Sequence, residues 1–199
     1  MTVYCATGNP GKLREFQLAA PDFDIQRLPV SVPAPEETGA TFEANAIEKA
    51  TAYGSHVAGF LFADDSGLEV DALGGEPGVR SARYAGEHAS DDANNALLLA
   101  RLRDLGKSNE NCAARFICVI ALVKDGRLVK TFRGAVEGRI IDAPRGTGGF
   151  GYDPLFFCEE TGCTFGEASI DRKMTVSHRA RALTAMFAYL REARNTASI

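Results

Sequence analysis

The chain has 199 residues, of which 45% are hydrophobic and 24% charged, a composition typical of an ordinary soluble protein. Its formal net charge of -4 argues against a general coat for nucleic acid, although it allows a nucleotide site with local positive charge. No apolar run approaches membrane-spanning length and the N-terminus lacks a signal-peptide pattern, so no association with a membrane is expected.

The length suits one large domain or two small lobes with a sizeable core. Five cysteines are an odd number and no Cys-x-x-Cys occurs, so neither a zinc site nor a disulfide framework is indicated. Cys158 and Cys163 are spaced to pair, but free thiols in a reducing cytoplasm are the simpler interpretation.

The first elements predict a strand, a glycine-rich loop and a helix. Residues 3–6 form the strand, and Leu13, Phe16 and Ala20 recur at helical spacing after the turn-rich segment 7–12. This order of elements presents backbone N–H groups to an anion.

The loop between them reads Thr7-Gly8-Asn9-Pro10-Gly11-Lys12. It is not a Walker A loop, because Ala6 stands at the first glycine position and Leu13 follows Lys12 where Ser or Thr is required. Two interpretations remain open: contact of Thr7, Asn9, Lys12 and backbone N–H groups with phosphate, or a plain strand-to-helix turn.

A second strand is predicted at residues 24–28, followed by an irregular segment, 29–39, that holds three prolines and the acidic pair Glu36-Glu37. Thr41 is then predicted to cap a helix whose apolar stripe consists of Phe42, Ala46, Ile47 and Ala50.

The segment Leu61–Gly67 runs from three apolar residues into two adjacent carboxylates, Asp64 and Asp65, and then Ser66. The apolar run predicts a buried strand, and since Asp is rare in strands, the pair is expected at the strand's carboxyl end, where open α/β sheets bind ligands. Adjacent carboxylates repel unless they share a cation or proton, which suits Mg²⁺. An Asp-rich turn, with Asp64 and Ser66 capping backbone groups, is the alternative.

The middle of the chain predicts a loop at residues 74–78, a helix capped by Ser90 that runs to about Leu105, and a hairpin. The hairpin joins apolar strands at 116–123 and 128–138 through Asp125-Gly126. Arg80, Arg83 and Tyr84 could contact phosphate or lie on the surface, and the sequence favours neither.

Gly146, Gly148 and Gly151 spell G-x-G-x-x-G, but a dinucleotide fingerprint must open a helix. Here Asp153 precedes a proline and is disfavoured in helix, so we reject the dinucleotide interpretation. What remains is a loop whose aromatic residues, Phe150 and Tyr152, suit a stacked base. Aromatic residues of a core strand are the alternative.

Lys173 and Ser177-His178-Arg179 precede a last apolar helix face, for which Ser177 is a suitable N-cap. His178 and Arg179 then lie in the first turn, where cations oppose the helix dipole. An anionic or hydrogen-bonding ligand there and a solvated helix start are both compatible with the pattern.

Five motifs together carry a resemblance that covers essentially the whole chain. In order, they are Thr7–Lys12, Glu36-Glu37-Thr38-Gly39, Ala63-Asp64-Asp65-Ser66-Gly67, Gly148-Gly149-Phe150-Gly151-Tyr152-Asp153-Pro154 and Ser177-His178-Arg179. They resemble the inosine triphosphate pyrophosphatase family. One departure is Ala44, which stands where the family usually has Glu, and Glu43 is a possible substitute from the neighbouring position.

The resemblance implies an α/β fold in which residues 1–199 form a single domain of two lobes. An elongated mixed β-sheet with flanking helices and a central nucleotide cleft are part of this expectation, as is a cytoplasmic homodimer that binds neither nucleic acid nor membrane. It further implies Mg²⁺-dependent hydrolysis of non-standard purine nucleoside triphosphates (dITP, ITP, XTP) to the monophosphate and pyrophosphate.

The resemblance also assigns roles to residues. Asp65 is the expected proton acceptor, and Glu36 and Asp65 are the expected metal ligands. The expected substrate contacts are Thr7, Gly8, Asn9, Pro10, Gly11, Lys12, Ser66, Phe150, Gly151, Tyr152, Asp153, Lys173, His178 and Arg179.

Two other functions use similar residues. A metal-dependent nucleotidyl or glycosyl transferase also places paired acids on a nucleotide, but it needs an acceptor. A non-catalytic nucleotide sensor binds without needing the acidic pair. The resemblance favours the hydrolase over both.

Overall fold

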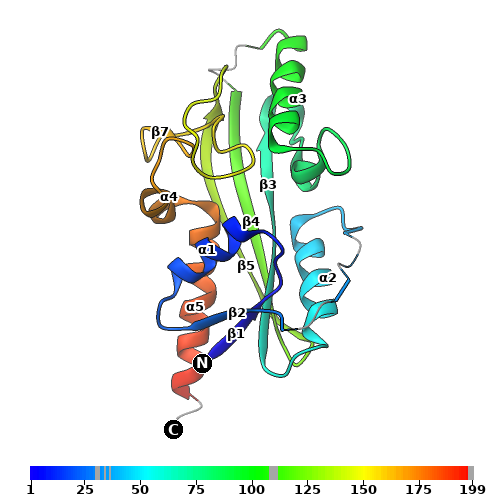
Figure 1. Ribbon diagram of the computed structural model, residues 1–199, viewed down its shortest axis with the longest axis vertical. Coiled ribbons are helices and arrows are strands. Elements are labelled where there is room, and N and C mark those ends of the chain that lie inside the picture. The colour runs from blue at the N-terminus through cyan, green and yellow to red at the C-terminus, as the bar shows by residue number, and fades with distance from the viewer. Residues whose placement is uncertain (30–31, 34, 36, 108–111, 197–199) are drawn as a thin grey trace. The chain divides into compact units, whose positions relative to one another are not determined.

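The computed structural model describes residues 1–29, 32–33, 35, 37–107 and 112–196 of an α/β protein (Figure 1). Its described strands form one mixed sheet in the order β2-β1-β3-β4-β5-β6-β7. The chain divides into two compact units. The first unit comprises Met1–Asp65, Cys118–Gly134 and Arg179–Ile199, and the second comprises Ser66–Ile117 and Ala135–His178. The predicted α/β class with a mixed sheet and flanking helices is confirmed.

Strands β3 (Phe60–Val70), β4 (Cys112–Lys124) and β5 (Arg127–Ile140) contribute residues to both units. The first unit also holds β1 (Thr2–Cys5), β2 (Asp24–Arg27), α1 (Pro10–Ala19), α2 (Phe42–Gly54) and, from Arg179 on, α5 (His178–Thr196). The second unit also holds η1 (Asp71–Leu73), η2 (Gly78–Arg83), α3 (Asp91–Asp104), β6 (Phe156–Cys158), β7 (Cys163–Thr164) and α4 (Ile170–Val176).

Helix α1 begins earlier than the apolar spacing predicts, at Pro10. The side chain of Asn9 accepts hydrogen bonds from the backbone N–H groups of Gly11 and Lys12, at 2.8 and 3.2 Å. A proline at the first helical position loses no hydrogen bond, and its ring already sets the required φ. Lys12 therefore lies in the first turn of the helix.

The predicted caps of two further helices are confirmed. Thr41 accepts from the backbone N–H of Ala44 and starts α2, and Ser90 accepts from that of Ala93 and starts α3. Each cap satisfies an N–H group that has no partner inside the helix.

The core of the first unit brings α1 and α5 onto one face of β3. The ring of Phe62 lies 5.0 Å from that of Phe16 on α1 and 6.3 Å from that of Phe187 on α5. Because side chains alternate along a strand, residue 64 of β3 faces the same two helices, whereas residue 65 faces the other side. Figure 1 shows α2 on the side of β3 away from α1 and α5.

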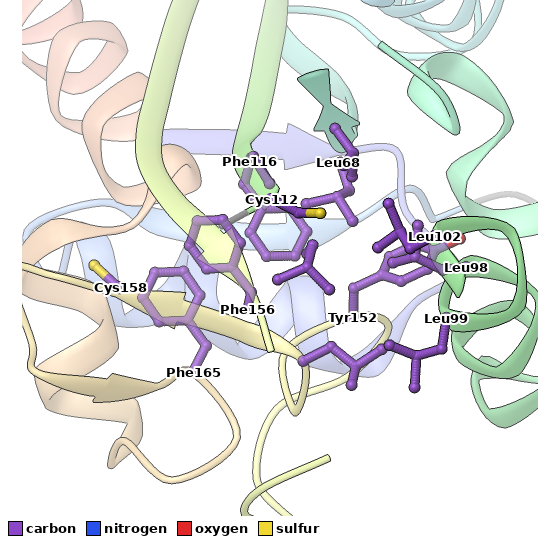
Figure 2. Packing of buried hydrophobic residues seen from close by; sticks show 14 of the residues in the cluster. Leu68, Leu98, Leu99, Leu102, Cys112, Phe116, Tyr152, Phe156, Cys158 and Phe165 are labelled. Atoms are coloured by element: carbon purple, nitrogen blue, oxygen red, sulfur yellow. The ribbon is translucent and has the colours of Figure 1, made fainter. Parts of the chain in front are cut away.

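The core of the second unit is built around three phenylalanines, Phe116, Phe156 and Phe165, whose ring centroids lie 4.6 to 6.1 Å apart (Figure 2). The apolar face of α3 adds Leu98, Leu99 and Leu102 to the same cluster. Strands β6 and β7 and helix α4 of this unit are missing from the sequence-based elements, because segments this short hold too few residues to show a period.

The predicted hairpin is confirmed. Asp125 and Gly126 form a two-residue turn between β4 and β5 with φ angles of 50° and 75°. Positive φ at both positions matches the right-handed twist of the flanking strands, and it favours glycine. The Asp125 carboxylate accepts from the backbone N–H of Gly59 at 2.7 Å, which ties the turn to the start of β3.

The expected position of the acidic pair is wrong. Asp64 and Asp65 do not end a strand, because β3 continues through them to Val70. Strand β1, however, is registered with β3 only at Tyr4↔Leu61 and Cys5↔Phe62. The carboxyl end of β1 therefore lies directly beside the acidic pair. Ligands bind at the carboxyl ends of strands in open α/β sheets. The acidic pair therefore still lies at such an end, but the strand that ends there is β1 and not β3.

All five cysteines are described and have free thiols, as expected. Among the described helices, none has the length and apolar character needed to cross a membrane.

Candidate functional site

The two adjacent carboxylates have separate partners. Asp64 contacts Lys12 on α1 and Arg179 on α5, whereas Asp65 contacts Asn45 and Lys49 on α2. The alternation of side chains along β3 directs them to opposite faces of the sheet. The premise that they must share one cation is therefore corrected: each carboxylate contacts cations of its own, Asp64 on one face and Asp65 on the other.

Asp64 is the centre of a buried charge network. Its Oδ2 lies 2.9 Å from Lys12 Nζ and 3.5 Å from Arg179 Nε, and Asp64 and Arg179 are 3% and 1% exposed. Burial alone would raise the pKa of Asp64, but the charges of Lys12, Arg179 and Lys49 outweigh it and hold that pKa well below its usual range. Asp64 is thus a fixed anion that holds cations in place.

The loop before α1 combines a helix N-terminus with the ammonium group of Lys12. The Thr7 hydroxyl accepts from the backbone N–H of Asn9 at 3.1 Å, and the Asn9 side chain is used as the helix cap. Of the polar side chains predicted here, Lys12 is the one that carries charge. Its side chain remains 18% exposed while it pairs with Asp64.

On the other face of β3, Asp65 is held by two groups from α2. Asn45 Nδ2 donates to Asp65 Oδ2 at 3.0 Å, and Lys49 Nζ lies 3.2 Å from Asp65 Oδ1. Lys49 Nζ also lies 3.0 Å from Glu37 Oε1, so one ammonium group bridges two carboxylates. Burial raises the pKa of Asp65, and Lys49 opposes this shift without cancelling it.

The amide of Asn45 is oriented by the backbone. Its Oδ1 accepts from the N–H of Gly39 at 2.8 Å, which leaves Nδ2 to donate to Asp65. A Cβ at position 39 would lie 2.6 Å from Asn45 Oδ1, so the close approach needs glycine.

The donor set around Asp65 fits a hard cation. The side-chain oxygens of Asp65 and Glu37 already share the positive charge of Lys49, and magnesium often uses only one or two carboxylates together with substrate phosphates. Glu36, the predicted second metal ligand, lies outside the described residues. In the part of the chain that the structure describes, no three His, Cys, Asp or Glu side chains gather as a metal centre.

In the second unit, the predicted substrate residues gather around one buried ion pair. Lys173 Nζ lies 2.6 Å from Asp153 Oδ2, and both side chains are 3% exposed. The same carboxylate oxygen accepts from the backbone N–H of Phe150 at 2.9 Å. The Lys173 ammonium lies 4.9 Å from the centre of the Phe150 ring and 5.5 Å from that of Phe165. These contacts fix the glycine-rich loop to α4.

Tyr152 belongs to the core. Its ring is 3% exposed within the cluster of Figure 2, and its hydroxyl donates to the backbone carbonyl of Ser81 at 2.9 Å. The alternative of a core aromatic therefore holds for this side chain, while Phe150 is only half-buried. His178 also packs on a core ring, parallel to Phe116 at a centroid distance of 4.8 Å.

The glycine-rich loop is tied to α3 through Gly151, whose N–H donates to Asp91 at 2.6 Å and whose carbonyl accepts from Asn95 at 3.0 Å. A cavity of about 620 Å³ lies beside it and is lined by α3 and by residues 146–151. Of the predicted substrate residues, Phe150 and Gly151 line this cavity. Ser66 lies in the second unit and is half-buried.

The predicted site residues omit three residues around Asp65, namely Glu37, Asn45 and Lys49, although Glu37 stands in one of the five motifs. Asn45 and Lys49 are four apart on α2, and such residues share one face of a helix. That spacing is a signal that the sequence does contain. Glu43, considered as a substitute for the glutamate that Ala44 replaces, instead accepts from the Thr131 hydroxyl at 2.6 Å.

Comparison with known proteins agrees with the motifs. The chain matches the model of the Ham1 family over residues 3–189. It is 50% identical over 182 residues to a Geobacter sulfurreducens protein named dITP/XTP pyrophosphatase, covering 89% of this chain and 90% of that one. A Thermus thermophilus protein of the same name is 48% identical over 190 residues, covering 94% of this chain and 90% of the other.

Among solved structures, the fold is similar to that of a HAM1 protein from Coxiella burnetii, with a TM-score of 0.86 at 37% identity. The match covers 96% of this chain and 99% of that chain. The family resemblance inferred from the five motifs is thereby confirmed, and this chain belongs to the Ham1 family.

Proposed function

We propose that this protein is a nucleoside triphosphate pyrophosphatase that hydrolyses dITP, XTP and ITP to the monophosphate and pyrophosphate. The observation that carries the proposal is the arrangement at the acidic pair. One face of β3 offers the Lys12 ammonium at a helix N-terminus, and the other offers Asp65 beside Glu37. The first arrangement suits phosphate oxygens, and the second suits a hard cation and a water nucleophile. The names of the Geobacter and Thermus relatives support the same activity.

For the triphosphate, we assign the Thr7–Lys12 loop at the N-terminus of α1 and the Lys12 ammonium. The side chains of Thr7 and Asn9 already accept from the N–H groups of Asn9, Gly11 and Lys12, so the loop would attract the anion through the helix dipole and the Lys12 charge. Lys12 is placed to stabilise negative charge as it develops on the phosphate oxygens in the transition state.

For the hydrolytic step, we assign Asp65 as the proton acceptor of the attacking water, with attack in line at the α-phosphorus. Asn45 and Lys49 hold the Asp65 carboxylate in one orientation, which such a base requires. Asp64 is committed to Lys12 and Arg179, so it is the less suitable base.

For the metal, we assign Asp65 together with the Glu36-Glu37 pair as the residues that would hold Mg²⁺. The bound ion would supply charge neutralisation of the phosphate oxygens and of the departing pyrophosphate. For the nucleoside, we assign Phe150, Gly151, Asp153, Lys173, His178 and Arg179, together with Ser66, and leave out Tyr152, whose side chain belongs to the core. The half-buried Phe150 ring suits stacking on a purine, which adds affinity without choosing between bases.

We further propose that residues 1–199 act as one domain in a cytoplasmic homodimer. The family resemblance supports both the single domain and the dimer, and the free thiols agree with a reducing compartment.

One assay tests the activity. Release of pyrophosphate is measured with dITP, XTP, ITP, GTP and ATP, with Mg²⁺ and with excess chelator. We expect turnover of the first three, much slower turnover of GTP and ATP, and none with chelator. A transferase would show no turnover with nucleotide and water alone, and a sensor would bind the nucleotide without releasing pyrophosphate.

The proposed contact between Lys12 and the triphosphate is tested with Lys12→Ala. We expect KM and the inhibition constant of pyrophosphate to rise about tenfold or more, because a charge-assisted hydrogen bond contributes about 1.5–3 kcal/mol. Arg14→Ala is the matched control, since Arg14 is a basic residue of the same helix whose side chain is exposed. Equal kinetics for both variants and the wild type would show that this loop is only a turn.

A further inference from the structure

The motifs assign no role to Glu15, although it is almost completely buried. It lies on α1 three residues after Lys12, and its side chain is 3% exposed. A carboxylate that stays charged inside a protein needs a cationic or hydrogen-bonding partner. Arg179 is such a partner, since its Nη1 lies 2.6 Å from Glu15 Oε2.

Arg179 is in turn close to the anion that holds Lys12. The Nε of Arg179 lies 3.5 Å from Asp64 Oδ2, and the same oxygen accepts Lys12 Nζ at 2.9 Å. The two cations therefore share one carboxylate oxygen. Lys12 has the shorter contact, and the Arg179 guanidinium has its shorter contact with Glu15.

We infer that Glu15 is a positioning residue for Lys12, acting through Arg179 and Asp64. Glu15 holds the guanidinium at its own carboxylate and so leaves Asp64 Oδ2 to the lysine. Asp64 then fixes the ammonium at the first turn of α1. This inference rests on the proposed function, since it takes the Lys12 ammonium to be a phosphate contact.

The charges of the network explain why removal of Glu15 would reach Lys12. Glu15, Asp64, Arg179 and Lys12 carry two negative and two positive charges in ion pairs. Without the Glu15 charge, the buried guanidinium of Arg179 must move closer to the Asp64 carboxylate, because an unpaired charge in the interior is costly. Lys12 then loses the contact that orients it, and it binds phosphate from many conformations in place of one.

A double-mutant cycle between Glu15→Gln and Lys12→Ala tests this, with the inhibition constant of inorganic pyrophosphate as the readout. We expect Glu15→Gln alone to raise that constant about fivefold or more, with KM rising more than kcat falls. In the Lys12→Ala background, we expect the same substitution to change it less than about twofold.

A merely structural role gives a different result. If Glu15→Gln acts by loosening the protein, its effect on pyrophosphate inhibition is the same with and without Lys12, and that additivity would overturn the inference. The control is Asp22→Asn, which breaks the exposed ion pair of Asp22 with Arg191 in the same unit. It should leave the inhibition constant unchanged.

The cycle also separates this inference from the proposed function. If Lys12→Ala leaves pyrophosphate inhibition unchanged, the assignment of Lys12 to the phosphate fails, and the inference fails with it. If Lys12→Ala weakens inhibition but the cycle is additive, only the role of Glu15 fails. Should Glu15→Gln not fold, Glu15→Asp, which keeps the charge on a shorter side chain, replaces it. Glu15→Asp is expected to raise the inhibition constant of pyrophosphate by less than Glu15→Gln does, and only in the protein that retains Lys12.

Discussion

Asp65→Asn is expected to lower kcat for XTP by about 10²–10⁴-fold, the range found when a general base is removed. The substitution keeps the shape of the side chain but removes the negative charge and the proton acceptor. Lys49 Nζ and Asn45 Nδ2 each contact one oxygen of this carboxylate, so the amide, which has a single acceptor oxygen, also loses one of the two contacts that orient the group.

The measurement is kcat at saturating XTP and Mg²⁺, together with a thermal unfolding curve that shows the variant to be folded at the assay temperature. Asp142→Asn serves as the control, because Asp142 is exposed. Wild-type turnover in the Asp65 variant would exclude it as the base and move the chemistry elsewhere.

The second large effect concerns stability. Lys173→Ala is expected to lower the free energy of unfolding by about 3–5 kcal/mol, because it leaves the buried carboxylate of Asp153 without its cation. The ion pair has both side chains at 3% exposure and a separation of 2.6 Å, so bulk water screens it little. The backbone N–H of Phe150 would remain as a hydrogen-bond donor to Asp153.

Urea unfolding followed by circular dichroism gives this free energy. The matched control is Glu159→Gln, which breaks an exposed ion pair with Arg139 in the same unit and should cost less than about 1 kcal/mol. Combining Lys173→Met with Asp153→Asn removes both charges and should recover part of the loss. A Lys173→Ala variant as stable as the wild type would contradict the structural role of the pair, and its kinetics would then report on substrate contact alone.

The sequence determined those features that depend on residues close together in the chain. Thr41 and Ser90 predicted the starts of α2 and α3, because an N-cap is a contact across three residues. Asp125-Gly126 predicted the hairpin through its turn chemistry. The order of five motifs was enough to identify the family.

The tertiary structure decided which charges meet. The adjacent carboxylates of Asp64 and Asp65 read as one cluster in the sequence, but β3 continues through them and its pleat separates them onto two faces. Which face each takes depends on the register of β3 in the sheet, and no short motif encodes that register.

The partners of these carboxylates come from distant parts of the chain. Arg179 reaches Glu15 across 164 positions, and Asn45 reaches Asp65 across 20. Local spacing along the sequence cannot predict such pairs, since they form only when α1, α2 and α5 pack against β3. The sequence by itself therefore determined the family and the motifs from which the site is proposed, while packing decided that Asp64 contacts Lys12 and Arg179 and that Asp65 contacts Asn45 and Lys49.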